Sequence, residues 1–257
     1  MTYAPDDSSV QLAERLGIIS ASCDVVATHQ LSTSVHELVL GGPAKELAGV
    51  AGNDVMVRVT NHAGAFVRRR YSVRALDENL DQLTLWITTA HGGAGSSWAQ
   101  RVRPGQLVDV IGPRGKITLD EHADWHLFVG DLSGMGAFYR MAQSIEAPGR
   151  AIFIIEVDAP DDALTAPMGE GLGLTGIFVD RMGRPQNDPS GLMSGLAAFE
   201  FPPDRGHAYL FGEFRVTRAL QVALRDRGLT DEQISRKAFW RYGRANADHG
   251  EPDKSED

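Results

Sequence analysis

The segment WHLFVGDLSGMGAFYRMAQSIE, residues 125–146, marks the point at which the pattern of the chain changes. A short apolar run ends at Asp131, and helical spacing follows it. Further along, the apolar runs RAIFIIEV, GIFVDR and AYLFGE precede VTRALQVALRDRG, which has one apolar helical face and stops at Gly228. Strands that alternate with helices predict a parallel α/β sheet in this half of the chain.

Upstream of that segment, from Cys23 to about Leu119, short β-like runs are separated by turn residues, and one helix is expected from Ser96 to Val102. The runs are CDVVATHQLS, VHELVL, DVMVRVT, RYSVRAL, LTLWITTA and QLVDVIG. Their number and spacing predict an antiparallel barrel or sandwich.

We therefore predict a two-domain chain of the β plus α/β class, with an N-terminal antiparallel barrel followed by a parallel α/β domain. The predicted parts are a tail or short helix over 1–22, the barrel over 23–120, the α/β domain over 124–244 and a solvated acidic tail over 245–257.

Composition excludes several classes of protein. The 257 residues include 34 Asp and Glu against 25 Lys and Arg, a net charge of −9, which argues against a broad nucleic-acid surface. The sequence has no apolar run of ~18 residues to span a bilayer and no secretory signal in MTYAPDDSSV. Cys23 is the only cysteine, which excludes internal disulfides and an iron–sulfur cluster held by the chain's own thiolates. We expect a soluble cytoplasmic protein with neither nucleic-acid nor membrane partners.

The basic run RRRYSVR, residues 68–74, is the first candidate for chemistry. In a strand, Arg69 and Tyr71 share one face, and Arg70, Ser72 and Arg74 share the other. An arginine offers a planar fork to phosphate oxygens, and a tyrosine ring stacks on flat heteroaromatic groups. The alternative interpretation is a charged edge strand that deters aggregation.

The glycine-rich run AHGGAGSSWA, residues 90–99, is the second candidate, because it follows an expected strand and opens an expected helix. Glycines there let backbone N–H groups approach an anion, and Ser96 or Ser97 can cap the helix or bind the ligand. The alternative is a plain glycine turn with a serine cap, in which His91 is an ordinary turn residue.

The run VGDLSGMGA, residues 129–137, lies between a strand and a helix, where open α/β sheets bind nucleotides. By contrast, residues 171–176 match the dinucleotide pattern G-x-G-x-x-G letter for letter, yet lead into an expected strand instead of a helix, so we discount them. His122 and His126 have no third ligand nearby, and we expect no structural metal. The sequence contains neither a nucleophile elbow nor a Walker-type phosphate loop.

In combination, these motifs resemble the ferredoxin–NADP reductase superfamily and, within it, the siderophore-interacting protein family of FAD-dependent ferric-siderophore reductases. The resemblance runs from about residue 23 to residue 244. The residues that match the family's motifs are Arg69, Tyr71, Ser72 and Arg74; His91, Gly92, Gly95, Trp98 and Ala99; Pro104-Gly105-Gln106; Gly112-Pro113-Arg114-Gly115; Gly130-Asp131; Gly212-Glu213; and Phe239-Trp240-Arg241-Tyr242-Gly243.

The resemblance implies an FAD-binding barrel and an α/β domain that binds NAD(P)H. Tyr71 would lie against the isoalloxazine ring and Ser72 near its reactive nitrogen, so these two form the expected catalytic pair. Arg69 would hold the pyrophosphate with Ser96 and Ser97. Further cofactor-binding residues are expected in the same motifs and in the nucleotide turn: Arg74, His91, Gly92, Gly95, Trp98, Asp131 and Ser133.

The expected substrate is a ferric siderophore, which receives electrons from the flavin and releases Fe(II). Ferric siderophores are often anionic, so we expect a basic patch of Lys237, Arg241 and Arg244, with Trp240 as a flat contact. The alternative is that these charges merely end a strand or helix. Ferredoxin is an alternative electron donor, and analogy with superfamily relatives indicates a monomer.

Three departures from the family's motifs keep other functions open. The loop after His91 is short, Gly136 replaces a proline in the nucleotide turn, and Phe239 takes the place of a tyrosine. The alternatives are an FAD-dependent tailoring enzyme or flavin reductase of secondary metabolism, and a redox-inactive flavin-bearing binding protein.

Overall fold

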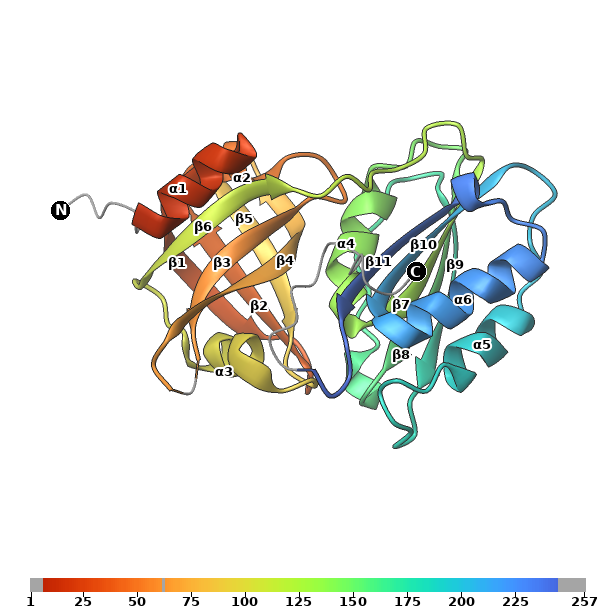
Figure 1. Cartoon of the computed structure of the whole chain (residues 1–257). Helices are drawn as coiled ribbons and strands as arrows, with labels where there is room; N and C mark the ends of the chain where they lie inside the picture. Colours follow the sequence, from red (N-terminus) through yellow and green to blue (C-terminus); the bar gives the residue numbers. More distant parts are fainter. Residues whose placement is uncertain (1–6, 62, 245–257) are drawn as a thin grey trace. The chain divides into compact units, whose positions relative to one another are not determined.

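The computed structural model describes residues 7–61 and 63–244, which form two compact units (Figure 1). Unit 1 comprises Met1–Leu119, Met135–Ser144 and Leu164–Met168, and unit 2 comprises Asp120–Gly134, Ile145–Ala163 and Gly169–Asp257. The acidic tail predicted over 245–257 lies outside the described residues. No helix among the described residues is long and apolar enough to cross a membrane.

Unit 1 is built on a closed antiparallel barrel, with strand order β1-β2-β5-β4-β3-β6. Its strands are β1 (Ile19–Gln30), β2 (Val35–Gly41), β3 (Asp54–Thr60), β4 (Phe66–Asp77), β5 (Gln82–Thr88) and β6 (Leu107–Arg114). Every predicted run in this half forms one of these strands, and the predicted antiparallel barrel is confirmed.

The barrel interior is filled by apolar side chains, as in β5, where Leu83, Leu85 and Ile87 alternate with half-exposed residues and point inward. Two short helices add to the same core: Leu47 of α2 (Ala44–Ala48) and Trp98 of α3 (Gly93–Arg101) are buried in it. A third helix, α1 (Asp7–Leu16), contributes Ala13 to a smaller apolar cluster. The N-terminal segment predicted as a tail or short helix therefore contains a helix.

Unit 2 contains a parallel sheet with strand order β11-β10-β7-β8-β9, as predicted for this half. Its strands are β7 (Trp125–Asp131), β8 (Arg150–Val157), β9 (Gly173–Asp180), β10 (Gly206–Glu213) and β11 (Ile234–Trp240). The inner strands β7, β8 and β10 are almost wholly buried, which is typical of parallel sheets. Helices α5 (Ser190–Ala197) and α6 (Phe214–Asp226) pack their apolar residues against the sheet core (Figure 1).

Helix α4 (Leu132–Gln143) begins directly after β7, and from Met135 onward it belongs to unit 1. There Arg140 donates hydrogen bonds to the carbonyl oxygens of Ala48 and Gly49, at 2.9 and 2.7 Å. The ring of Tyr139 meets Trp86 edge to face, at 5.8 Å between centroids. This part of α4 is therefore anchored to the residues around the barrel.

Several local expectations differ from the structure. Helix α3 begins at Gly93, three residues before the expected start at Ser96. Strand β11 and the short helices α2 and α5 were not expected, nor were two single 3-10 turns, Pro160–Asp162 and Asp231–Gln233. The segment 171–176 leads into β9, which confirms that it does not open a helix.

Candidate functional site

Strand β4 carries the basic motif in the wall of the barrel; its residues 66–72 pair with β3 and its residues 73–77 pair with β5. Residues 68–72 thus have a paired strand on one side only, so the alternative interpretation as a charged strand edge stays a prediction. Arg70 is bound to the buried carboxylate of Asp54 through two hydrogen bonds, Nε to Oδ1 at 2.9 Å and Nη2 to Oδ2 at 2.6 Å. Arg70 thus stabilises the barrel wall, and Arg69 and Tyr71 lie on the other face of the strand.

Tyr71 is held between the barrel core and α3. Its ring is half-buried and stacks on Trp98, with 6.4 Å between centroids and 20° between planes. Its hydroxyl is buried and has no hydrogen-bond partner among the residues that the structure describes. Burial raises the pKa of Tyr71, so its phenol stays protonated. A buried polar group without a partner is uncommon and points to a site that a ligand completes.

Gly95 makes this position of Tyr71 possible. A Cβ atom at residue 95 would lie 2.5 Å from the Tyr71 hydroxyl and 3.5 Å from Cγ of Arg69. Only glycine therefore lets α3 approach the face of β4 that carries both side chains.

The start of α3 is bare of side-chain caps. Gly92, with φ +67°, stands at the N-cap position, and no side chain there accepts a hydrogen bond from the first backbone N–H groups of the helix. Gly93 follows with φ +88°. The Ser96 hydroxyl lies 2.9 Å from the carbonyl oxygen of Gly92 and 3.1 Å from that of Thr88, so it ties the helix to the end of β5. The expectation that Ser96 or Ser97 caps the helix is wrong, because both residues already lie within it.

The remaining motif residues of unit 1 lie apart from this pair. Ser72 is buried, and no other described residue binds its hydroxyl. Arg74 lies where the register of β4 against β5 shifts; it donates to Gln143 Oε1 at 2.8 Å and lies over the Trp86 ring at 4.8 Å. Burial lowers the pKa of Arg74. His91 is half-buried in the loop before α3.

These residues of unit 1 fit a flavin dinucleotide. The half-exposed Tyr71 ring offers a stacking face, the Arg69 guanidinium offers donors to phosphate oxygens, and the uncapped first turn of α3 offers backbone N–H groups to an anion. The unpartnered Tyr71 hydroxyl adds a polar group in the same place.

In unit 2, Asp131 ends β7 and is buried. Its Oδ1 accepts hydrogen bonds from the backbone N and the hydroxyl of Ser133, at 2.8 and 2.5 Å. Its Oδ2 accepts from the backbone N of Glu213 and from the indole Nε1 of Trp240, both at 3.0 Å. One carboxylate therefore shapes the turn into α4 and joins the ends of three strands.

The end of β10 is built in a similar way. Glu213 Oε2 caps α6 by accepting from the backbone N of Arg215 at 2.5 Å and of Val216 at 2.9 Å. Its Oε1 accepts from the backbone N of Tyr242 at 3.2 Å. Both acidic residues in the expected nucleotide motifs thus serve the local fold of unit 2.

The predicted substrate residues lie on β11 or just after it. Lys237 Nζ lies 5.2 Å from the Phe239 ring, and the Arg241 guanidinium lies 4.8 Å from the Phe214 ring. Trp240 donates its indole N–H to Asp131 Oδ2, and Ser133 donates its hydroxyl to the other oxygen of the same carboxylate. The structure therefore brings these three predicted residues together.

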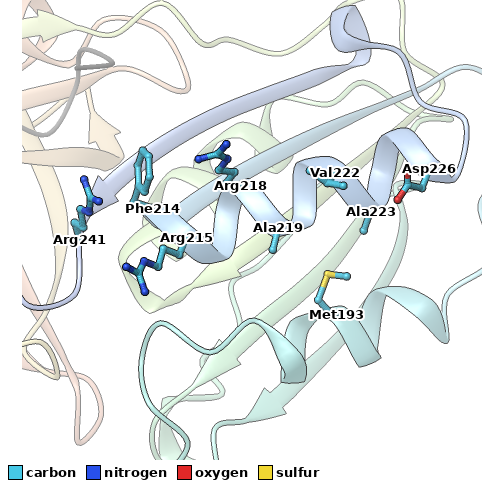
Figure 2. Close-up of a pocket in the computed structure, with 9 residues that line it drawn as sticks. All are labelled: Met193, Phe214, Arg215, Arg218, Ala219, Val222, Ala223, Asp226 and Arg241. Carbon is cyan, nitrogen blue, oxygen red and sulfur yellow. The ribbon is translucent and has the colours of Figure 1, made fainter. Parts of the chain in front are cut away.

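Sequence reasoning missed a basic groove on α6, lined by Arg215, Arg218 and Arg241 (Figure 2). The signal was available, since Arg215 and Arg218 are three residues apart and so share a helix face, opposite the apolar face that α6 buries. No group of three His, Cys, Asp or Glu side chains within residues 7–61 and 63–244 is arranged to hold a metal ion.

Two family models match consecutive parts of the chain. Residues 22–119 match the oxidoreductase FAD-binding domain, and residues 123–243 match the siderophore-interacting protein family.

Curated relatives align with parts of the chain. An uncharacterized protein of Mycobacterium tuberculosis (strain H37Rv) is 32% identical over 192 residues, 68% of this chain and 65% of that protein. The ferric vibriobactin reductase ViuB of Vibrio cholerae is 31% identical over 97 residues, 37% of this chain and 36% of the reductase. An NADPH-dependent ferric-chelate reductase of Escherichia coli is 24% identical over 169 residues, 64% and 63% of the two chains. The chain thus spans less than two thirds of the length of these relatives.

Solved structures share the fold along almost the whole chain. A siderophore utilization protein from T. fusca superposes with a TM-score of 0.78 at 24% identity, covering 90% of this chain and 96% of that one. The siderophore-interacting protein of Acinetobacter baumannii gives a TM-score of 0.74 at 18% identity, with 89% and 92% covered. The barrel with its match and the parallel sheet with its own match lead to one conclusion: the chain contains an oxidoreductase FAD-binding domain followed by a siderophore-interacting protein domain, in the fold of solved siderophore-interacting proteins.

Proposed function

We propose that the chain is a reductase that passes electrons from NADH or NADPH through FAD to a ferric siderophore in the cytoplasm, releasing Fe(II). The observation that carries the proposal is the arrangement of Arg69, Tyr71 and the uncapped start of α3 in a domain of the FAD-binding family. Relatives named ferric vibriobactin reductase and ferric-chelate reductase support the choice of reaction.

Each residue of the proposed flavin site has a separate task. The Tyr71 ring would stack on the isoalloxazine, the Ser72 hydroxyl would bind near its reactive nitrogen, and Arg69 would pair with the pyrophosphate. Trp98 and Gly95 would hold Tyr71 in place, since one stacks on its ring and the other makes room for its hydroxyl. When bound, FAD supplies both hydride acceptance and electron release, which protein side chains cannot.

The other cofactor residues support this site in our proposal. Gly92 leaves the first turn of α3 open to phosphate, with His91 in the preceding loop, and Ser96 fixes that turn to β5. Arg74 would act through its neighbours Trp86 and Gln143, because its guanidinium already contacts both.

The nicotinamide donor would bind at the turn between β7 and α4. Asp131 is buried and already accepts four hydrogen bonds, so we propose that it and Ser133 shape the turn, and that the backbone meets the nucleotide. Ferredoxin remains the alternative donor, and a monomer the proposed form.

Lys237 and Arg241 would attract an anionic ferric chelate, with Trp240 as a flat contact beside them. Hard oxygen donors hold Fe(III) far better than Fe(II), so a single electron weakens the chelate and no bond of the siderophore needs to be hydrolysed.

Anaerobic mixing tests the proposal. The FAD-loaded protein should lose its yellow absorbance on addition of NADH or NADPH and regain it on addition of a ferric siderophore, with Fe(II) trapped by a chromogenic chelator. Bleaching without reoxidation by iron would instead favour a flavin reductase or tailoring enzyme. A flavin that no nicotinamide or reduced ferredoxin bleaches would favour a redox-inactive binding protein.

A further inference from the structure

A groove of about 630 Å³ lies along α6 in unit 2, and its two ends differ in character (Figure 2). Arg215, Arg218 and Arg241 gather with Phe214 at the N-terminal end of the helix, and Asp226 lies at the other end. A volume of this size is typical of small-molecule sites.

The basic end concentrates positive charge. Arg241 and Arg236 both lie over the ring of Phe214, at 4.8 and 5.6 Å from its centroid. Burial lowers the pKa of Arg236, and the charges of Arg218 and Arg225 lower it further. Arginines that crowd one aromatic ring in an acidic protein produce a local positive field that attracts anions.

Two of these arginines are available to a ligand. Arg215 and Arg218 are exposed, and neither guanidinium makes a hydrogen bond or ion pair with any residue in the described part of the chain. The backbone N–H groups at the start of α6 are not available, because Glu213 already caps Arg215 and Val216. An anion here would therefore be held by side chains and not by the helix terminus.

Between the basic end and Asp226 the groove is apolar. Val222 on α6 is half exposed, Met193 of α5 lies across the groove from α6 beneath Ala223, and Ala219 lies between Val222 and the basic end (Figure 2). An apolar surface that continues directly from a cluster of guanidinium groups matches a molecule with an anionic head and an apolar body.

We propose that this groove binds a small amphiphilic organic anion, whose phosphate or carboxylate head pairs with Arg215, Arg218 and Arg241 and whose apolar body lies on Met193 and Val222. The site lies wholly within unit 2 and shares Arg241 with the proposed chelate patch, but it needs neither the flavin nor the reductase assignment.

Calorimetric titration of the full-length, FAD-loaded chain with 1-naphthyl phosphate tests the inference. We expect saturable binding that is at least tenfold tighter than that of 1-naphthol or of inorganic phosphate, each of which offers only half of the required chemistry. Arg215→Ala and Arg218→Ala should each weaken binding at least tenfold. Arg15→Ala, which removes an exposed arginine from α1, is the matched control and should change it less than twofold.

Val222→Asp keeps every arginine and places a negative charge on the apolar floor, so it should also weaken binding tenfold or more. Binding of inorganic phosphate as tight as that of naphthyl phosphate would overturn the inference, as would unchanged affinity in both arginine variants. A second titration uses polyglutamate, an acidic polymer. If polyglutamate binds and naphthyl phosphate does not, the inference is overturned and the groove is indicated as a site for an acidic protein partner. Flavin absorbance separates the two proposals, since a chain that stays colourless after incubation with FAD and yet binds naphthyl phosphate supports the groove and contradicts the flavin site.

Discussion

The buried carboxylate of Asp131 links the carboxyl ends of three strands of the parallel sheet, β7, β10 and β11. It accepts hydrogen bonds from Ser133, Glu213 and Trp240, and the last two are 82 and 109 residues away in sequence. Replacing the carboxylate with a methyl group leaves buried N–H donors without acceptors.

We therefore predict that Asp131→Ala lowers the free energy of unfolding by about 3 kcal/mol, because several charge-assisted hydrogen bonds are lost together. Ser133→Ala removes only one side-chain partner and should cost about 1 kcal/mol. Urea denaturation of both variants measures the difference. Equal losses of unfolding free energy for the two substitutions would show that the hydrogen bonds from Glu213 and Trp240 contribute little to stability.

A second prediction at this scale concerns the substrate. Lys237→Ala combined with Arg241→Ala should raise the apparent KM for an anionic ferric chelate about tenfold, roughly 1.4 kcal/mol of binding energy, and leave kcat nearly unchanged. The control is a neutral ferric chelate, whose KM should stay constant. An unchanged KM for the anionic chelate would contradict the role of these cations.

Helix α3 is the element on which the flavin proposal depends. Its close approach to β4 requires the absence of a side chain at Gly95, where a Cβ would lie 2.5 Å from the Tyr71 hydroxyl. Gly95→Ala should improve helix propensity by up to ~1 kcal/mol and yet displace Tyr71.

We predict that Gly95→Ala lowers the affinity for FAD at least tenfold and lowers the free energy of unfolding by no more than about 2 kcal/mol, because the gain in helix propensity offsets part of the steric cost. Gln100→Ala, an exposed change in the same helix, is the control and should leave flavin content intact. Equilibrium dialysis with FAD measures both variants, and a Gly95→Ala protein with full flavin content would refute the packing argument.

The elements that could be predicted from sequence are those with a clear period. Strand β5 alternates buried and half-buried residues without a break, and α6 repeats its apolar residues with helical spacing. Strand β11 was missed because it lies at the sheet edge and its residues ISRKAFW are mostly half-buried, so no apolar alternation marks them. The early start of α3 was missed because glycines are poor helix formers, and tertiary packing of Ala94 and Trp98 overrides that preference.

The candidate site likewise has a part that the sequence predicts and a part that only the structure reveals. Strand alternation was enough to place Arg69 and Tyr71 on one face. The neighbours of Arg74 and the partners of Asp131 come from distant parts of the chain, so only the folded structure reveals that those side chains are already engaged.

At the scale of the whole chain, unit 2 contains two buried histidines and a half-buried aspartate that make stability depend on pH. Burial lowers the pKa of His126 to about 4, and it also lowers that of His207, against the opposing effect of Asp120. Burial alone would raise the pKa of Asp120, but hydrogen bonds from Arg205, the His122 backbone and His207 lower it to about 2.

The direction of the effect follows from these pKa values. His126 binds a proton in the unfolded chain near pH 6.5 but in the folded chain only near pH 4, so stability falls as pH drops through that window, by about 3 kcal/mol. The stability that Asp120 contributes persists down to about pH 3.8 and is lost between there and about pH 2.

Urea denaturation between pH 7 and pH 4 should therefore show a steep loss of stability that His126→Phe reduces. His29→Gln, at an exposed position, should keep the slope of the parent chain. An identical slope for His126→Phe would mean that other groups cause the acid sensitivity.

The central claim is that the Arg69 and Tyr71 face of the barrel holds FAD. Titration of the flavin-free full chain with FAD, followed by flavin fluorescence, tests it most directly, with Arg68→Ala on the same strand as the matched control for Arg69→Ala. The account predicts saturation at a single FAD per chain, affinity at least tenfold weaker in Arg69→Ala, and little change in Arg68→Ala. A chain that takes up no FAD, or an Arg69→Ala variant that binds it as tightly as the parent, would contradict the account.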